Sequence, residues 1–283
     1  MQAAGGFGVI QETTMPDKME TVAKKVIFEA GELIRLHIGQ VSRSRIQRKG
    51  PADFVTEVDK KCENLIVEEI RKNFPGHSIM AEETAEEGLG VGYTWVIDPV
   101  DGTTNLIHGF PFVAVSIAVC LEKKPILGFV LDPVRNELFW AKKGGGAWLN
   151  DTRLPKRRKV KLDQALIATG FPFRSRQYVD DYLAAFKSIF LQVSGIRRAG
   201  AAALDLAYVA AGRVDGFWEI GLKAWDIAAG ALLITEAGGV ISDFSGEETH
   251  LFSGNVVSGV AGVYPFLLDQ MQKRLVPALA SKR

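Results

Sequence analysis

The chain has 283 residues, of which 47% are hydrophobic and 24% are charged, and its formal net charge is +1 at pH 7. These proportions are typical of a globular protein and exclude an intrinsically disordered chain. Because positive and negative charges nearly balance, no global field favours nucleic acid or an anionic membrane. The longest apolar stretches, 113–121 and 201–211, are shorter than the roughly 20 residues of a membrane span, so no span is expected.

The first residues and the cysteines bear on the compartment in which the protein works. Residues 1–15 contain three glycines but no positive stretch followed by a long apolar one, so we expect a loose N-terminal extension and no signal peptide. Cys62 and Cys120 lie in apolar-periodic segments, where we expect them to be buried and unpaired. This cysteine usage suits the cytoplasm.

Two amphipathic helices are predicted in the first third of the chain. Between 16 and 38, apolar residues recur every three or four positions, with Pro16 in the first turn and Gly39 at the end. A second apolar stripe runs from 57 to 74 and stops at Pro75. The pattern predicts a helix pair with one apolar face on each helix.

The rest of the chain predicts two sheets. Short β-rich runs at 94–98, 113–121, 126–131 and 137–141 indicate a mostly antiparallel sheet. Strand-like runs then alternate with helical ones, which favours a second sheet covered by helices; the strands are 166–169, 214–219 and 240–243, and the helices are 201–211 and 227–237.

The polar run 150–161 is the best candidate for a boundary between these parts. We therefore divide the fold into 16–150, a helix pair with an antiparallel sheet, and 151–283, a smaller helix-covered sheet. The run contains Lys156, Arg157, Arg158, Lys159 and Lys161. It is either a solvated connector or a basic patch for RNA or another partner.

One segment brings two acids close to exposed backbone amides, namely Trp95-Val96-Ile97-Asp98-Pro99-Val100-Asp101-Gly102-Thr103-Thr104-Asn105. A strand is predicted to end at Asp98, where Pro99 turns the chain out of the sheet, and Asp101 follows three residues on. Gly102-Thr103-Thr104 is typical of a helix start, whose free N–H groups can receive a phosphate. In isolation the motif is also an ordinary capped turn.

Two further acidic sites change this interpretation. Glu82 and Glu83 follow the apolar run 78–81, and Asp226 lies within 223–230, where a helix is predicted to begin. Taken alone, the glutamates could face solvent and Asp226 could cap the helix. Together with Asp98 and Asp101 they favour a hard divalent cation, because Mg²⁺ prefers carboxylate oxygens and bridges them to phosphate.

The whole pattern resembles the inositol monophosphatase family, within the lithium-sensitive, Mg²⁺-dependent phosphatase superfamily. The resemblance rests on the segment from Trp95 to Asn105, on Trp225-Asp226-Ile227-Ala228-Ala229-Gly230 and on Glu236-Ala237-Gly238-Gly239, and it covers about 19–262. Segments 115–119, 203–213 and 215–219 are similar to the bacterial branch. The resemblance implies an α/β (α+β) fold, a layered αβαβα sandwich like that of fructose-1,6-bisphosphatase, and a homodimer.

The resemblance also implies roles for individual residues. Glu82, Asp98 and the carbonyl of Val100 would hold one Mg²⁺, and Asp98, Asp101 and Asp226 a second, with a third near Glu82. The ions would neutralise the phosphate and activate a water. Thr103 would orient that water through its hydroxyl, and Asp59 would accept or polarise the hydroxyl proton. Glu82 would also be catalytic, with Glu83 assisting through water. Substrate contacts would come from Asp101, Gly102, Thr103, Ala202, Glu219 and Asp226.

Asp59 has a second interpretation, because Thr56 to Asp59 has the spacing of a capping box, and the two roles are compatible. Two residues depart from the familiar animal pattern and bear on substrate choice. Lys223 stands where a histidine is familiar, and Ala201 where a small hydroxyl residue is common. None of His37, His77, His108 and His250 has zinc-ligand spacing.

We expect hydrolysis of a phosphate monoester of a small polyol, with inositol 1-phosphate as the leading substrate. Fructose-1,6-bisphosphate or a 3′-phosphonucleotide is the alternative substrate. A non-enzymatic role in transcription or ribosome synthesis also stays open, and it could coexist with hydrolysis. That role would need one exposed basic patch, formed by residues 156–161 together with Arg43, Arg45, Arg48 and Lys49.

Overall fold

A computed structural model describes residues 14–41, 46–50, 53–84 and 88–281. The predicted N-terminal extension therefore lies almost entirely outside the described residues, and so do Arg43 and Arg45. Within the described part, no helix combines the length and apolar character that crossing a membrane requires.

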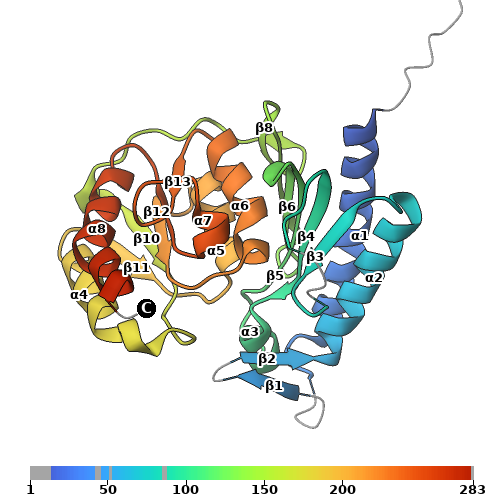
Figure 1. The fold of residues 1–283 in the computed structure, drawn as a ribbon, viewed down its shortest axis with the longest axis horizontal. Coiled ribbons are helices and arrows are strands. Elements are labelled where there is room, and N and C mark those ends of the chain that lie inside the picture. Colours follow the sequence, from blue (N-terminus) through green and yellow to red (C-terminus); the bar gives the residue numbers. More distant parts are fainter. Residues whose placement is uncertain (1–13, 42–45, 51–52, 85–87, 282–283) are drawn as a thin grey trace, which may run out of the picture.

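The predicted helix pair forms one outer layer of the molecule (Figure 1). Helix α1 (Met15–His37) begins where the Thr14 side chain accepts a hydrogen bond from Asp17 N, and α2 (Glu57–Asn73) begins at a capping box of Thr56 and Asp59. Their apolar stripes are buried against each other and against the neighbouring sheet. The predicted boundaries are confirmed to within a residue or two.

The next layer is a seven-stranded sheet whose strands lie in sequence order. Its strands are β3 (Ser78–Ala81), β4 (Tyr93–Asp101), β5 (Ala114–Leu121), β6 (Lys124–Asp132), β7 (Glu137–Lys142), β8 (Gly146–Leu149) and β9 (Thr152–Arg153). Only β3 and β4 pair in parallel among these strands, which confirms the mostly antiparallel prediction. A two-stranded hairpin, β1 (Ile46–Gly50) and β2 (Asp53–Thr56), precedes α2.

Strand β5 shows why its sequence is a continuous apolar run. Val115, Ile117 and Val119 belong to the core beneath α1 and α2, whereas Ala118 and Cys120 belong to the core on the opposite face. Because both faces of the strand are covered, successive side chains that point to opposite faces must all be apolar. Cys62 and Cys120 are both buried and free, as predicted.

Helices α5 (Ala202–Ala211) and α6 (Ala224–Glu236) cover that opposite face. Small residues allow them to approach closely. A Cβ added to Gly128 on β6 would lie 2.8 Å from the carbonyl oxygen of Ala229, and one added to Gly230 would lie 2.5 Å from Leu206. Strand β6 therefore packs directly against α6, and α6 against α5, with no room for a side chain at Gly128 or Gly230.

A second, five-stranded sheet lies on the far side of α5 and α6, in the order β11-β10-β12-β14-β13 (Figure 1). Its strands are β10 (Leu166–Thr169), β11 (Gly195–Arg197), β12 (Gly216–Glu219), β13 (Val240–Ser242) and β14 (Val256–Gly259). Helices α4 (Val179–Phe190) and α8 (Tyr264–Ser281) cover its outer face. The order of layers is therefore αβαβα, which confirms the predicted fold class.

Two predicted boundaries were wrong, and two helices were missed. Strand β4 does not end at Asp98 but continues to Asp101, with an irregular register against β5 between these two residues. Pro99 is tolerated there because a bulge needs no ladder hydrogen bond from its nitrogen. Helix α6 begins at Ala224, three residues before the predicted start. Helices α4 and α8 were not predicted.

Candidate active site

The irregular end of β4 places two carboxylates side by side. Val100 N donates to Asp98 Oδ1 at 3.0 Å, so the chain turns tightly between Asp98 and Asp101. Both side chains are buried, with exposed fractions of 1% and 7%. The bulge, and not the end of the strand, is therefore what presents the two acids to the same space.

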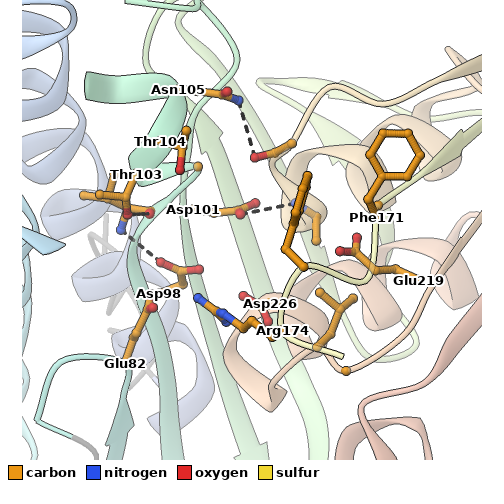
Figure 2. A pocket seen from close by; sticks show the side chains of 18 of the residues that line it. Glu82, Asp98, Asp101, Thr103, Thr104, Asn105, Phe171, Arg174, Glu219 and Asp226 are labelled. Atoms are coloured by element: carbon orange, nitrogen blue, oxygen red, sulfur yellow. Dashed lines mark hydrogen bonds between the residues drawn. The ribbon is translucent and has the colours of Figure 1, made fainter. Parts of the chain in front are cut away.

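Asp226 reaches this space from the opposite half of the fold (Figure 2). It lies in the first turn of α6, where its Oδ2 accepts a hydrogen bond from Lys223 N at 2.6 Å. Asp98, Asp101 and Asp226 each offer a carboxylate oxygen, and these oxygens lie within 4.8 Å of one another. The structure thus brings together three acids that are far apart in the sequence.

Glu82 lies at the edge of the same pocket. It follows β3 directly, and its backbone N donates to Ile97 O on β4 at 3.2 Å. Its charge raises the pKa of Asp98, second only to the effect of burial. Val100, whose carbonyl is a predicted ligand, also lines this pocket.

Burial and mutual repulsion disfavour the charged forms of these acids. Burial raises the pKa of Asp98 well above its ordinary range, and burial followed by the charge of Asp226 raises the pKa of Asp101 to about 7. The pKa of Asp226 is raised as well, mainly by burial. A hard divalent cation fits this set of oxygen donors, because its charge would offset the repulsion that the carboxylates create in its absence.

Asp101 is oriented by the start of α5. Its two carboxylate oxygens accept hydrogen bonds from Ala202 N at 3.2 Å and from Ala203 N at 2.7 Å. The positive end of the helix dipole favours a carboxylate in this position. Asp101 is therefore carried by β4 in one half of the fold and held by α5 from the other half.

Thr103 and Asp59 form a hydrogen-bonded pair beside the acids. Thr103 Oγ1 lies 2.8 Å from Asp59 Oδ1 and 3.2 Å from Val100 O. Asp59 Oδ2 accepts from Thr56 N at 2.9 Å, which completes the capping box of α2. The two interpretations of Asp59 are therefore compatible in one geometry. Burial raises the pKa of Asp59.

Gly102 forms the bend between Asp101 and the short helix α3 (Thr103–His108). Its φ is +94°, and a Cβ there would lie 3.1 Å from Phe112 O and 3.3 Å from Gly200 O. Both the left-handed backbone and the crowding favour glycine. The first N–H groups of a helix have no partner within it, so they are suited to a phosphate.

The acids line one pocket with a cavity volume of about 410 Å³. Glu219, which the sequence analysis had singled out, lies on its wall, and burial followed by the charge of Asp226 raises its pKa to about 8. The pocket is also lined by four residues that the sequence does not predict, namely Phe171, Phe173, Arg174 and Arg198. Their loops follow β10 and β11, whose ends meet at this edge of the small sheet, but no motif marks them.

The two departures from the family pattern flank the pocket. Lys223 is exposed, and Ala201 is buried against Gly102, where its Cβ lies 3.4 Å from the position of an added Cβ. Neither is among the described residues that line the cavity. Their side chains therefore lie at its margin.

Comparison with known proteins places this site in a family. The model of the inositol monophosphatase family matches residues 15–281. The chain belongs to the inositol monophosphatase family. The acidic pocket therefore lies in a fold and among motifs that belong to a family of phosphatases. Members of this family typically use Mg²⁺.

Individual relatives carry two kinds of name. The chain is 49% identical to the Nus factor SuhB of Pseudomonas aeruginosa over 92% of its length and 98% of that protein. It is 43% identical to an inositol-1-monophosphatase of Mesorhizobium japonicum, covering 90% of this chain and 96% of that protein. A solved IMPase structure from Thermotoga maritima is 35% identical, with a TM-score of 0.83 over 93% of this chain and 99% of that one.

Proposed function

We propose that this member of the inositol monophosphatase family hydrolyses a phosphate monoester of a small polyol, most readily inositol 1-phosphate, to the polyol and phosphate. The observation that supports this most strongly is the gathering of Asp98, Asp101 and Asp226, with oxygens within 4.8 Å of one another, in one pocket with Thr103. The name of the Mesorhizobium relative agrees with this substrate.

The residues suited to hold Mg²⁺ come from both halves of the fold. Glu82, Asp98 and the Val100 carbonyl would hold one ion, and Asp98, Asp101 and Asp226 would hold another, with a third near Glu82. Bound Mg²⁺ would supply Lewis-acid stabilisation of the charge that develops on the phosphate oxygens. Asp98 is the residue shared by the two sets.

The remaining residues act on the water and the substrate. The attacking water would donate to Thr103 Oγ1, whose own proton points to Asp59 Oδ1, 2.8 Å away. Attack on phosphorus forms one P–O bond and breaks the bond between phosphorus and the polyol oxygen; the water gives up a proton through Thr103 to Asp59, and the polyol oxygen takes a proton from solvent to leave as a hydroxyl. The N–H groups of Gly102 and Thr103 would hold phosphate oxygens, while Asp101, Ala202, Glu219 and Asp226 would contact the polyol.

A substrate panel tests this proposal. Initial rates of phosphate release would be measured for inositol 1-phosphate, fructose-1,6-bisphosphate and a nucleoside 3′,5′-bisphosphate, each with Mg²⁺ and with EDTA. We expect the highest kcat/KM for inositol 1-phosphate and loss of release in EDTA. Release that is indifferent to EDTA, or the absence of release from every monoester, would refute the proposal.

A transcription-associated role is a second candidate, supported by the name of the Pseudomonas relative and by the basic run 156–161. Arg157 is half-buried and pairs with Asp215 at 2.9 Å, whereas Lys156, Arg158 and Lys159 are exposed; of these, Lys156 Nζ donates to Glu236 O at 2.7 Å. Exposed cations are suited to a nucleic acid backbone or an acidic partner. Reversing the charge of Arg158 and Lys159 should abolish such binding while phosphate release stays at the wild-type rate.

The finer family properties complete the proposal. We expect a cytoplasmic homodimer that lithium inhibits by competing for a Mg²⁺ position. Light scattering at several protein concentrations would report the oligomeric state, and inhibition that weakens as Mg²⁺ rises would report the competition.

A further inference from the structure

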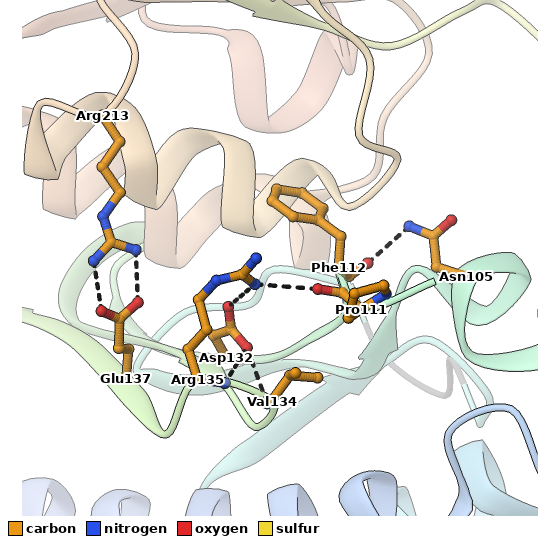
Figure 3. Close-up of polar contacts among 8 residues, drawn as sticks. All are labelled: Asn105, Pro111, Phe112, Asp132, Val134, Arg135, Glu137 and Arg213. Atoms are coloured by element: carbon orange, nitrogen blue, oxygen red, sulfur yellow. Dashed lines mark hydrogen bonds and ion pairs between the residues drawn. The ribbon is translucent and has the colours of Figure 1, made fainter. Parts of the chain in front are cut away.

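Asn105, two residues after Thr103, connects segments from both halves of the fold. Its side-chain Nδ2 lies 2.7 Å from Phe112 O, 2.9 Å from Ala199 O and 3.4 Å from Gly200 O. All three partners are backbone carbonyls, so only the NH₂ group of the amide can face them. Two donors therefore hold the loop that precedes β5 and the turn that precedes α5 (Figures 2 and 3).

The same carbonyls surround Gly102. Phe112 O and Gly200 O are the two atoms that a Cβ on Gly102 would approach most closely, at 3.1 and 3.3 Å. The turn through Ala199 and Gly200 then leads directly into α5, whose first N–H groups hold the Asp101 carboxylate. Asn105 therefore lies between the bend at Gly102, which faces the expected phosphate, and the turn that leads to the N–H groups holding Asp101.

Two arginines, Arg135 and Arg213, hold the segments around this contact in place (Figure 3). Arg135 donates to Pro111 O at 3.1 Å and to Asp132 Oδ2 at 2.8 Å, which ties the loop before β5 to the large sheet. Just beyond the other end of α5, Arg213 makes two hydrogen bonds of 2.6 Å with Glu137. Within this frame, Asn105 holds the turn at Ala199 and Gly200 that leads into α5, and Asp101 accepts from the first N–H groups of the helix itself.

We propose that Asn105 is a positioning residue that sets the first turn of α5 against Gly102, and thereby the orientation in which Asp101 faces Asp98 and Asp226. The inference rests on the proposed function for the identity of the cation. Side chains that orient metal ligands from behind typically change metal affinity or activity by about 10- to 100-fold when they are removed. Asn105 acts one step further back, through a helix terminus.

The test compares Asn105→Ala with Asn73→Ala. Asn73 Nδ2 also donates to a backbone carbonyl, Glu69 O at 2.9 Å, but lies at the end of α2 away from the pocket. Mn²⁺ binding would be measured by calorimetry, together with the melting temperature and the kcat and KM for inositol 1-phosphate. We expect Asn105→Ala to weaken Mn²⁺ binding and lower kcat by about 10-fold or more, with little change in KM at saturating metal.

Asn73→Ala should leave both Mn²⁺ affinity and kcat at wild-type values. If Asn105→Ala does not fold, Asn105→Ser, whose hydroxyl can satisfy one carbonyl, should show an intermediate loss of Mn²⁺ affinity. A lower melting temperature with unchanged Mn²⁺ affinity in the Asn105 variants would overturn the inference, because the amide would then be a structural bond alone. Wild-type protein that binds Mn²⁺ but releases no phosphate would refute the proposed function and leave this binding comparison valid.

Discussion

Replacing Thr103 by valine separates the two roles of Asp59. The Asp59 side chain is 1% exposed. Its Oδ1 accepts a hydrogen bond from Thr103 Oγ1 at 2.8 Å, and its Oδ2 accepts one from Thr56 N at 2.9 Å. Valine keeps the shape of threonine and removes the hydroxyl through which the proposed water would reach Asp59. A positioned proton acceptor contributes about 10²- to 10⁴-fold to a rate, which is about 3–5 kcal/mol of activation free energy.

The matched variant is Thr56→Val, which removes the hydroxyl that accepts from Val58 N and donates to Asp59 Oδ2, and leaves the Thr103 hydrogen bond to Asp59 Oδ1 in place. Loss of an N-cap hydroxyl costs about 0.5–2 kcal/mol of stability. We therefore expect Thr56→Val to lower the melting temperature with a small effect on kcat, and Thr103→Val to lower kcat by at least about 100-fold. Phosphate release at saturating Mg²⁺ and thermal unfolding measure the two effects. Equal losses of kcat in the two variants would refute the division of roles.

Three further tests address other parts of the site. Asp98→Asn and Asp226→Asn should each remove most activity and raise the metal-free melting temperature, because a buried repulsion is relieved; near-wild-type turnover would contradict the metal assignment. The pKa values of Asp101 and Glu219, about 7 and about 8, exceed those of the unfolded chain, so the metal-free protein should lose stability as pH rises from about 4 to about 8. Mg²⁺ should flatten that slope, and a metal-free melting temperature that rises with pH would refute the burial of these acids. Gly170→Ala would place a Cβ 1.9 Å from the Glu219 carboxyl carbon, so KM for the polyol phosphate should rise more than kcat falls, and unchanged KM would remove Glu219 from substrate binding.

The residues that gather at the site could be predicted because the chemistry needs particular side chains in particular motifs. The motifs predict Asp98, Asp101 and Asp226, the family resemblance adds Glu219, and all four line one pocket. Their roles as ligands and substrate contacts stay predictions, as does the division of the chain at residue 151. Asn105 was quoted within the motif, but its three carbonyl partners depend on tertiary contacts that no spacing reveals.

The structural errors have physical reasons of the same kind. Pro99 ordinarily ends a strand, but β4 carries it across a bulge where no ladder bond is required. Lys223 is not a residue type that caps helices, so the start of α6 was placed too late; there the backbone N of Lys223 bonds to Asp226 instead. Pro277 lies inside α8, where a proline argues against a helix from sequence alone.

Counting bound cations tests the central claim most directly. Mn²⁺ would be titrated into the wild-type protein and into Asp98→Asn, with binding followed by electron paramagnetic resonance. We predict at least two ions per wild-type chain and a loss of tight binding in Asp98→Asn, since that carboxylate is shared by both proposed ion sites. A wild-type chain that binds no ion, or a variant that binds as many as the wild type with equal affinity, would contradict it.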